Sequence, residues 1–363
     1  MVMRARIATA GARARGRRAE GCARGGGGRR ARTRASPREN ERLSDLESET
    51  LAGVKVWFPK APSMRSVWKD GDLGTLEAFA TFVKSSLRQN HLSRNPLEYA
   101  LADIRNRVLF HEGDEKNWHL RPLALEFGVG EGEALRLMSR YLGDLGQPDG
   151  TRIVGFETFD GLPEDWIAEW PVGSFSQGGI SVKVDGAYII PGFFHYTLPH
   201  FFNLLNDDAL FNNPAEQHFS RLTKPILKSD PRYPTKLMLV HIDCDLYSST
   251  ATVFENLQCG LRNSKIMTEP ATKFRFEKRA WFYLAFDELI GYSGADHHKM
   301  KAFHEFMLDS PELSVEVIGM DGRTDVGEPL RFYQHDEPCP HRALFKIWGP
   351  EPCKRHQSVR KSR

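Results

Sequence analysis

The sequence has no long apolar run and no paired cysteines. No stretch reaches the roughly eighteen consecutive apolar residues of a membrane-spanning helix, so we expect no membrane association through such a helix. The five cysteines are odd in number, far apart in the chain, and form no CxxC metal knuckle or disulfide framework. These absences exclude a disulfide-stapled secreted domain and favour a soluble protein of a reducing, intracellular compartment.

Acidic and aromatic residues are almost missing from residues 1–38, which contain twelve arginines, no lysine and one acid, Glu20. The rest of the chain has 38 basic and 46 acidic side chains, a net charge of −8. A chain region with a net negative charge is not expected to bind nucleic acid, because neutralising phosphates requires a basic surface.

The Arg-rich leader, residues 1–40, cannot bury enough apolar area to fold alone. An acid-poor, Arg-rich N-terminus is typical of an organelle transit peptide, for chloroplast or mitochondrion alike. A disordered tail or a misassigned translation start explains the composition equally well, and the protein is then expected in the cytoplasm.

Beyond the leader, apolar periodicity predicts helices over residues 73–87 and 97–108, followed by strands that alternate with helices. Such alternation predicts an α/β fold, a mostly parallel central sheet with helices on both faces. Two stretches, residues 161–235 and 262–279, do not fit a minimal sheet. The expected strands are 123–127, 152–157, 236–243 and 280–288, with 314–320 and 343–349 as a closing antiparallel pair.

The expected organisation has four parts: the leader 1–40, an N-terminal helical segment 41–115, a catalytic domain 116–350 and a basic tail 351–363. No internal repeat interrupts this order. Function is therefore expected to reside in the third part.

Acidic residues end four of the predicted strands. In an open parallel sheet the carboxyl ends of the strands meet at one edge, where ligands bind. Like charges gathered there repel, so a cation or a hydroxyl-rich ligand is expected to compensate them. The residues are Glu126, Glu157, Asp243 with Asp245, and Asp287 with Glu288.

A glycine-rich turn follows the first of these strands, with Gly128, Gly130 and Gly132. Glu133 stands where a dinucleotide fingerprint requires its third glycine, which disfavours an NAD-dependent dehydrogenase. The turn still lets backbone approach a cofactor closely, and Glu157 can accept hydrogen bonds from ribose hydroxyls. Glycine turns are common for steric reasons, so this motif alone is a weak signal.

Asp243 and Asp245 lie two residues apart after a buried strand, so on an extended chain they point the same way. Asp287 and Glu288 end the neighbouring strand. Several carboxylates without a nearby His–Cys cluster suit a hard cation such as Mg²⁺. Helix capping by Asp287 or Glu288 is the alternative explanation for that pair.

Five segments, in order, resemble the TylF/MycF/NovP group of macrocin-type O-methyltransferases over residues 120–310. They are LEFGVGEGEAL, GFETFDGLPE, PGFFHYTLP, HIDCDLYSST and FDELIGY. The resemblance implies a Rossmann-like class I methyltransferase fold, S-adenosyl-L-methionine as methyl donor, and Mg²⁺-assisted methylation of a sugar hydroxyl.

By the same resemblance, Asp243, Asp287 and Glu288 are expected metal ligands, and Asp245, beside Asp243, the catalytic base. The Asp287–Glu288 pair departs from the Asp-Asp of several relatives, which shifts the expected coordination geometry. The cofactor is expected against Glu126, Phe127, Gly128, Gly130, Glu157 and Phe159.

The expected partner is a small-molecule hydroxyl acceptor, and a homo-oligomer is left open. A phenolic or lipid hydroxyl, or a non-catalytic SAM-binding role, remains an alternative to a sugar. Other candidate bases are His195, His241 and the pair His297–His298, although a core or loop role is commoner for each.

Overall fold

A computed structural model describes most of the region after residue 73 and three short strands before it. The chain divides into two compact units, Met3–Lys60 and a larger one that contains Ala61–Arg363. The described residues are 46–51, 54–59, 66–68, 74–92, 94–110, 121–145, 152–206, 223, 235–263, 280–292, 294–321 and 341–349. The leader, most of residues 207–234, the insertion after residue 263 and the basic tail lie outside them.

The smaller unit contains a two-stranded antiparallel hairpin. Strand β1 (Leu46–Leu51) pairs with β2 (Val54–Pro59), with Leu46 opposite Pro59 and Leu51 opposite Val54. The sequence predicts a helical segment over residues 41–115, so this hairpin differs from that expectation.

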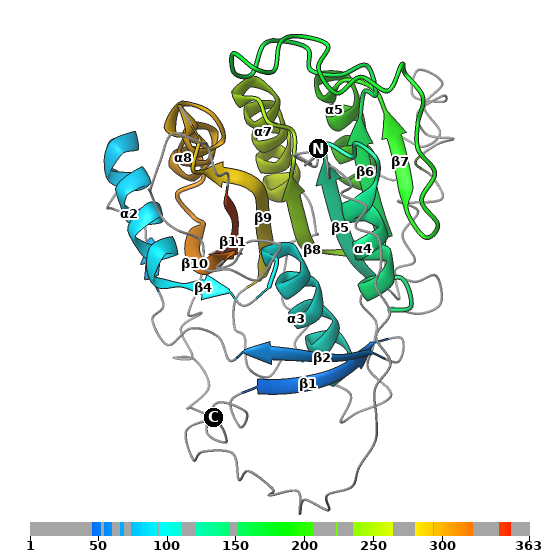
Figure 1. The fold of residues 1–363 in the computed structure, drawn as a ribbon, viewed down its shortest axis with the longest axis vertical. Helices are drawn as coiled ribbons and strands as arrows, with labels where there is room; N and C mark the ends of the chain where they lie inside the picture. The colour runs from blue at the N-terminus through cyan, green and yellow to red at the C-terminus, as the bar shows by residue number, and fades with distance from the viewer. Residues whose placement is uncertain are drawn as a thin grey trace, which may run out of the picture. The chain divides into compact units, whose positions relative to one another are not determined.

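The larger unit is built on a nine-stranded mixed sheet with the order β3-β10-β11-β9-β8-β5-β6-β7, and β4 pairs with β10 (Figure 1). Strands β5 to β9 run parallel, while β11 lies antiparallel between β9 and β10. The strands are β3 (Ser66–Trp68), β4 (His91–Leu92), β5 (Arg121–Phe127), β6 (Arg152–Glu157), β7 (Tyr188–Pro191), β8 (Thr235–Ile242), β9 (Trp281–Ile290), β10 (Ser314–Asp321) and β11 (His341–Trp348).

Helices cover both faces of this sheet (Figure 1). One face carries a row in which α5 packs on α7, α7 on α8 and α8 on α2, while α3 and α4 pack together on the other. The helices are α2 (Leu76–Gln89), α3 (Pro96–Phe110), α4 (Glu133–Leu142), α5 (Phe194–Asn206), α7 (Tyr247–Asn263) and α8 (Lys299–Asp309), with a short 3₁₀ turn η3 (Ala295–His297). This is the Rossmann-like α/β fold, with a mostly parallel sheet and helices on both faces, that the sequence predicts.

Local chemistry explains where the helices begin. The Thr75 hydroxyl accepts a hydrogen bond from the amide of Ala78 at 3.3 Å and caps α2. Pro96 begins α3, and the Asn95 side chain accepts from the amide of Leu97 at 2.9 Å. The start of α3 at Pro96 confirms the position predicted from the sequence.

Aromatic side chains fill the core between the sheet and the α2–α8–α7 layer. Phe303 is fully buried on α8, and its ring lies 5.3 Å from Phe79 on α2 and 5.0 Å from Phe345 on β11. Its ring also lies 5.3 Å from Phe286 on β9 and 6.1 Å from Phe254 on α7. One side chain thus joins three helices and two strands.

The structure adds elements to the stretches that the sequence left unassigned. Strand β7 and helix α5 lie within residues 161–235, and β3 and β4 extend the sheet at its other edge. The short, half-exposed β7 has the burial pattern of an edge strand, which gives little hydrophobic signal. Among the described helices, none has the length and apolarity needed to cross a membrane.

The chain changes direction within the sheet between β5 and β8. From β5 it proceeds through β6 to β7 on one side, then crosses to β8 and β9 on the other. A ligand crevice is expected outside the carboxyl ends of the strands at such a switch point. The candidate site is therefore expected beyond the ends of these strands, at Phe127, Glu157 and Ile242.

We predict that Phe303→Ala lowers the free energy of unfolding by about 3–5 kcal/mol, because it leaves a cavity where five elements meet. Urea unfolding followed by circular dichroism measures this loss. The exposed Ile180, 72% accessible, offers a control, since Ile180→Ala should change stability by no more than about 0.5 kcal/mol. Equal effects of the two substitutions would contradict this account of the core.

Candidate active site

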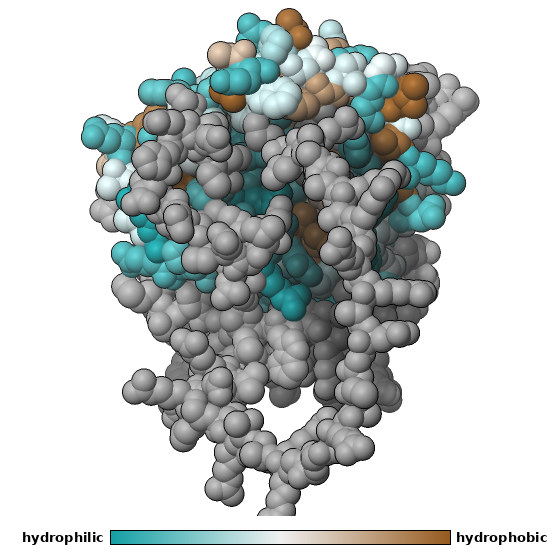
Figure 2. Space-filling model, in the orientation of Figure 1, coloured by the Kyte–Doolittle hydropathy of each residue, from teal (hydrophilic) through white to brown (hydrophobic). Residues whose placement is uncertain are grey.

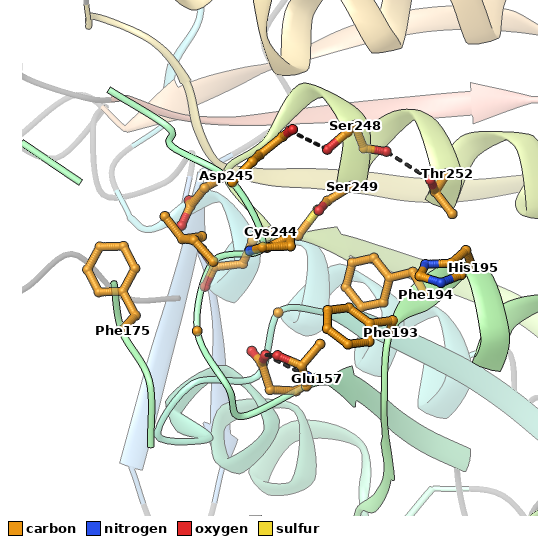
Figure 3. A pocket seen from close by; sticks show the side chains of 17 residues that line it. Glu157, Phe175, Phe193, Phe194, His195, Cys244, Asp245, Ser248, Ser249 and Thr252 are labelled. Atoms are coloured by element: carbon orange, nitrogen blue, oxygen red, sulfur yellow. Dashed lines mark hydrogen bonds between the residues drawn. The ribbon is translucent and has the colours of Figure 1, made fainter. Parts of the chain in front are cut away.

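A cavity of about 290 Å³ opens at the switch point of the sheet (Figure 3). Gly128 follows β5, Glu157 ends β6 and Asp243 follows β8, and all three line it. The other walls come from the segment after β6, the start of α5 and the start of α7. The lining residues are Gly128, Glu157, Thr158, Gly161, Leu162, Pro163, Glu164, Phe175, Phe193, Phe194, His195, Asp243, Cys244, Asp245, Ser248, Ser249 and Thr252.

The glycine turn lies in close contact with the backbone of Asp243. Gly128 has φ +93°, and a Cβ built there would lie 2.1 Å from the carbonyl oxygen of Asp243. The amide of Asp243 donates to the carbonyl of Phe127 at 2.8 Å, which continues the pairing of β5 with β8. A positive φ and a close backbone approach therefore each require glycine at residue 128.

The carboxylate of Glu157 ties two loops together. Its Oε2 accepts from the amides of Val129 at 3.1 Å and Gly130 at 3.3 Å, both in the glycine turn. Its Oε1 accepts from the amides of Thr158 at 2.7 Å and Phe159 at 3.2 Å in its own loop. Glu157 thus shapes the turn as well as presenting acceptor oxygens to the cavity.

Four other predicted cofactor residues, Glu126, Phe127, Gly130 and Phe159, do not line the cavity. Glu126 is 1% exposed, and burial raises the pKa of its carboxyl despite Nδ1 of His241 3.5 Å away. The Phe127 ring stacks on Phe156 in the core at 5.2 Å. Phe159 is buried with φ +63°, and its carbonyl accepts from the amides of residues 177 and 179. These side chains support the walls of the site.

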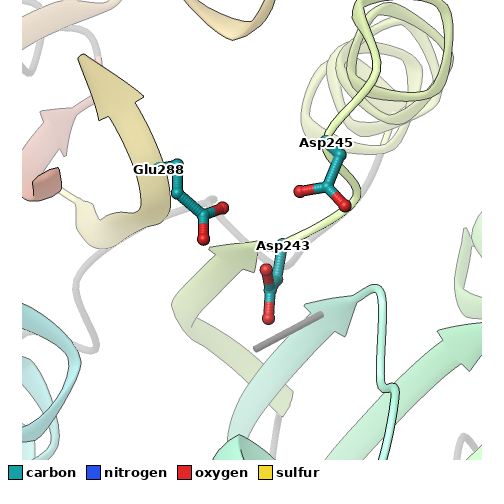
Figure 4. A group of neighbouring side chains, drawn as sticks. All are labelled: Asp243, Asp245 and Glu288. Carbon is teal, nitrogen blue, oxygen red and sulfur yellow. The ribbon is translucent and has the colours of Figure 1, made fainter. Parts of the chain in front are cut away.

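Asp243, Asp245 and Glu288 form a buried acidic group, in which one carboxylate oxygen of each lies within 4.8 Å of the others (Figure 4). Their exposed fractions are 2%, 2% and 3%. Burial, together with the nearby charges of Asp287 and Asp245, raises the pKa of Asp243 to about 7. Burial and the adjacent Asp287 also raise the pKa of Glu288 well above its ordinary value.

Asp245 reaches this group through a bend. Its φ of +58° places it in the left-handed region, which is uncommon for a residue other than glycine. The extended-chain geometry assumed from the sequence therefore does not hold at this residue, although Asp243 and Asp245 still converge. Strained backbone of this kind concentrates at functional sites.

Asp287 lies outside the acidic group, although the sequence places it among the metal ligands. Its Oδ1 accepts from Nε of Arg342 at 2.6 Å. Burial would raise the pKa of Asp287, but the Arg342 guanidinium outweighs burial and holds it below the usual range. The group instead contains Asp245, which the sequence assigns as the base.

The register between β9 and β11 shifts at Asp287 and Glu288. Ala343 on β11 pairs with Phe286 and His341 pairs with Ile290, so one residue of β11 faces three of β9. Asp287 and Glu288 are adjacent in β9, and successive side chains of a strand point to opposite sides. One acid therefore meets Arg342 while the next meets the acidic group.

A buried lysine completes the acidic group. Nζ of Lys299, at the start of α8, lies 3.4 Å from Oδ1 of Asp245 and 3.2 Å from Oε2 of Glu288. Burial would lower the pKa of Lys299, but Glu288 and Asp245 outweigh it and raise the pKa well above its usual value.

The sequence analysis missed Lys299 and Arg342. Lys299 precedes Ala302, Phe303 and Phe306 at helical spacing, and this pattern places it on the buried face of α8. An ionised side chain on an apolar face signals a buried charge pair. Arg342 carried no comparable signal, because its partner Asp287 lies 55 residues away on a neighbouring strand.

The candidate histidines have different surroundings. His195 lines the cavity, whereas His241 is 3% exposed in β8 beside Glu126, as expected for a core residue. His297 and His298 belong to the η3 turn, and the His298 ring lies 6.0 Å from Tyr292. His195 is therefore the histidine that faces the cavity.

Apolar side chains gather on the segment that joins β6 to α5. Three of the five large hydrophobic residues that are exposed in the described chain lie there, Val172, Ile180 and Phe193, and a fourth, Tyr196, lies in the first turn of α5. Figure 2 shows hydrophobic groups among hydrophilic ones at the end of the molecule where this segment runs. Phe193, Phe175 and Leu162 also line the cavity, so one wall of the site is apolar.

No protein-family model matches the sequence, and no curated protein matches it. Among solved structures, the chain is similar to the calicheamicin methyltransferase CalS11, with 17% identity, 88% of this chain and 98% of that chain covered, and a TM-score of 0.32. It is also similar to an O-methyltransferase from Bacillus cereus in complex with SAH, with 12% identity, 76% and 90% coverage, and a TM-score of 0.33. The function proposed below rests on the residues of the cavity.

We predict that Gly128→Ala destabilises the protein by on the order of 3 kcal/mol, because the new methyl group meets the Asp243 carbonyl and φ is positive. Gly173 has φ +81° with nothing within 4 Å of its built Cβ. Gly173→Ala thus supplies the backbone strain without the clash, and should cost about 1–2 kcal/mol. Denaturant unfolding of both variants isolates the contact, and equal losses would mean that no close approach exists.

Proposed function

We propose that this protein is an S-adenosyl-L-methionine-dependent O-methyltransferase of the macrocin type, assisted by a divalent metal. One observation carries the proposal: the glycine turn with Glu157 and the acids Asp243 and Asp245 face the same cavity. A methyl donor held by the turn would then lie beside carboxylates able to activate a hydroxyl. The acceptor is a small molecule, most simply a sugar or a glycosylated metabolite.

The cofactor side is supported by the shape of the turn. Gly128 and Glu157 both line the cavity, so the backbone of the turn and a carboxylate that would accept from ribose hydroxyls border the same space. Glu133 begins α4 at the position where a dinucleotide fingerprint requires glycine, which disfavours NAD. The apolar Phe193 stands on the same cavity wall and suits a planar base.

The acidic group fits a hard divalent cation. Three carboxylates within 4.8 Å and one ammonium carry a net charge of −2 when all are ionised. Asp243, Asp245 and Glu288 would hold the cation, since oxygen ligands are those that Mg²⁺ prefers. When bound, such a cation lowers the pKa of a hydroxyl group beside it.

The protein side chains then have distinct tasks in the transfer. Asp245, at the cavity wall, accepts the proton of the acceptor hydroxyl as general base, a contribution of typically ~10²–10⁴-fold. Asp243 fixes the position of the acceptor oxygen relative to the glycine turn, because its backbone is joined to that turn. His195 is the alternative base on the same wall.

A phenolic or lipid hydroxyl is the second candidate acceptor. The apolar wall formed by Leu162, Phe175 and Phe193 favours it, because aromatic and acyl groups gain most from such a surface. Formation of SAH from SAM with panels of sugars, glycosides, phenols and hydroxylated lipids, with and without Mg²⁺, decides between the acceptors. SAH formation that needs no acceptor hydroxyl would contradict O-methylation.

We predict that the protein binds SAH but not NAD in isothermal titration calorimetry, and that Glu157→Ala weakens SAH binding by about 10–100-fold. The loss follows because a charged acceptor and the brace of the turn are removed together. Glu169→Ala changes an exposed acid of the same segment and should leave the affinity unchanged. Binding of NAD but not of SAH would contradict the proposed methyltransferase function and favour a dehydrogenase.

We predict that Asp243→Asn abolishes the metal-dependent turnover while SAH affinity stays within about threefold, because the substitution removes a ligand charge but keeps the side-chain shape. Turnover is measured with Mg²⁺ and after EDTA. Asp185→Asn, at an exposed acid outside the cavity, serves as the control. If the wild-type protein keeps its full turnover in EDTA, the proposed metal assistance is wrong.

A further inference from the structure

Lys299 is fully buried between segments that are distant in the sequence. Its ammonium contacts Asp245, in the bend after β8, and Glu288, in β9. The Trp166 ring, from the segment after β6, lies 6.0 Å from the same Nζ. Trp166 also packs edge-on against Tyr292 at 5.5 Å, so aromatic groups screen the ammonium from solvent.

The position of Lys299 in α8 offers no local compensation for its charge. It is the first residue of the helix, where the helix dipole disfavours a cation. Burying an ammonium is costly unless it is paired. The acids Asp245 and Glu288 therefore account for the burial of Lys299.

The contacts of Lys299 leave the acidic group partly unneutralised. Lys299 contacts one oxygen of Asp245 and one of Glu288, and a carboxylate oxygen of Asp243 lies within 4.8 Å of oxygens of both acids. When all three carboxylates are ionised, one ammonium leaves a charge of −2, which one divalent cation would balance. Without the Lys299 ammonium the charge would be −3.

We propose that Lys299 is the resident counter-ion of this acidic group, a positioning residue whose positive charge weakens divalent-cation binding at Asp243, Asp245 and Glu288. The inference rests on the proposed metal-assisted function and deepens it. A unit charge a few ångströms from a cation site repels the cation strongly in a poorly solvated interior. The divalent cation would then bind the acidic group reversibly and would not be held permanently.

The test is Lys299→Met in the full-length chain, with Mg²⁺ as the only added ligand. Without Mg²⁺ the variant should melt on the order of 10 °C lower than wild type, because three carboxylates lose their counter-ion. Saturating Mg²⁺ should raise its Tm more than it raises that of wild type. The Mg²⁺ Kd, from the dependence of Tm on concentration, should fall at least about tenfold.

Unchanged or weaker Mg²⁺ binding by Lys299→Met would overturn the inference while leaving the proposed function intact. If wild type itself shows no Mg²⁺ shift, the proposed metal site fails instead. The two failures are thus distinguishable, and neither reading depends on turnover.

A double variant covers the case in which Lys299→Met does not fold. Lys299→Met with Glu288→Gln has the wild-type charge of −2 in the group, so its Tm without Mg²⁺ should recover at least half of the loss. A double variant no more stable than Lys299→Met would overturn the counter-ion role. Lys299→Leu in place of methionine should behave as Lys299→Met does, because charge and not chain shape is decisive.

Discussion

The rest of the site depends on buried negative charge at the carboxyl edge of the sheet. Asp243, Asp245 and Glu288 meet in a space from which water is largely excluded, where like charges repel strongly. The chain meets this cost with Lys299 and, for Asp287, with Arg342. In the proposed function, the remaining charge of the ionised group is what a divalent cation would balance.

Much of this arrangement follows from sequence pattern. Buried apolar runs fix the parallel strands, and acids at the ends of β6, β8 and β9 mark the active edge, because parallel strands share their carboxyl ends. Strand β7 is only four residues long, which is too short for its pattern to be recognised, so its place in the sheet appears only in three dimensions. The acidic group itself was predicted with one member exchanged, Asp287 for Asp245.

That exchange has a physical cause. Successive residues of a strand point to opposite sides, so Asp287 and Glu288, adjacent in β9, do not both enter the group. Asp245 adopts a left-handed bend, which aspartate accepts more readily than most residues, but the local sequence does not require a bend at this position. Lys299 could have been found, because an ionised residue stands at helical spacing with Phe303 and Phe306. Strand pairing between distant parts of the chain decides which acids converge. The local sequence pattern contains no information about that pairing.

The close contact between Gly128 and the Asp243 carbonyl holds the glycine turn and the loop that contains Asp243 and Asp245 together as one rigid frame. The apolar wall belongs to a different part of the chain, the segment between β6 and α5, which meets this frame mainly through side chains such as Glu164 on Ser248. In the proposed methyltransferase, substitutions in that wall would change the acceptor without disturbing the spacing between the glycine turn and Asp243. Such a division would let the substrate range change while the chemistry of the transfer stays the same.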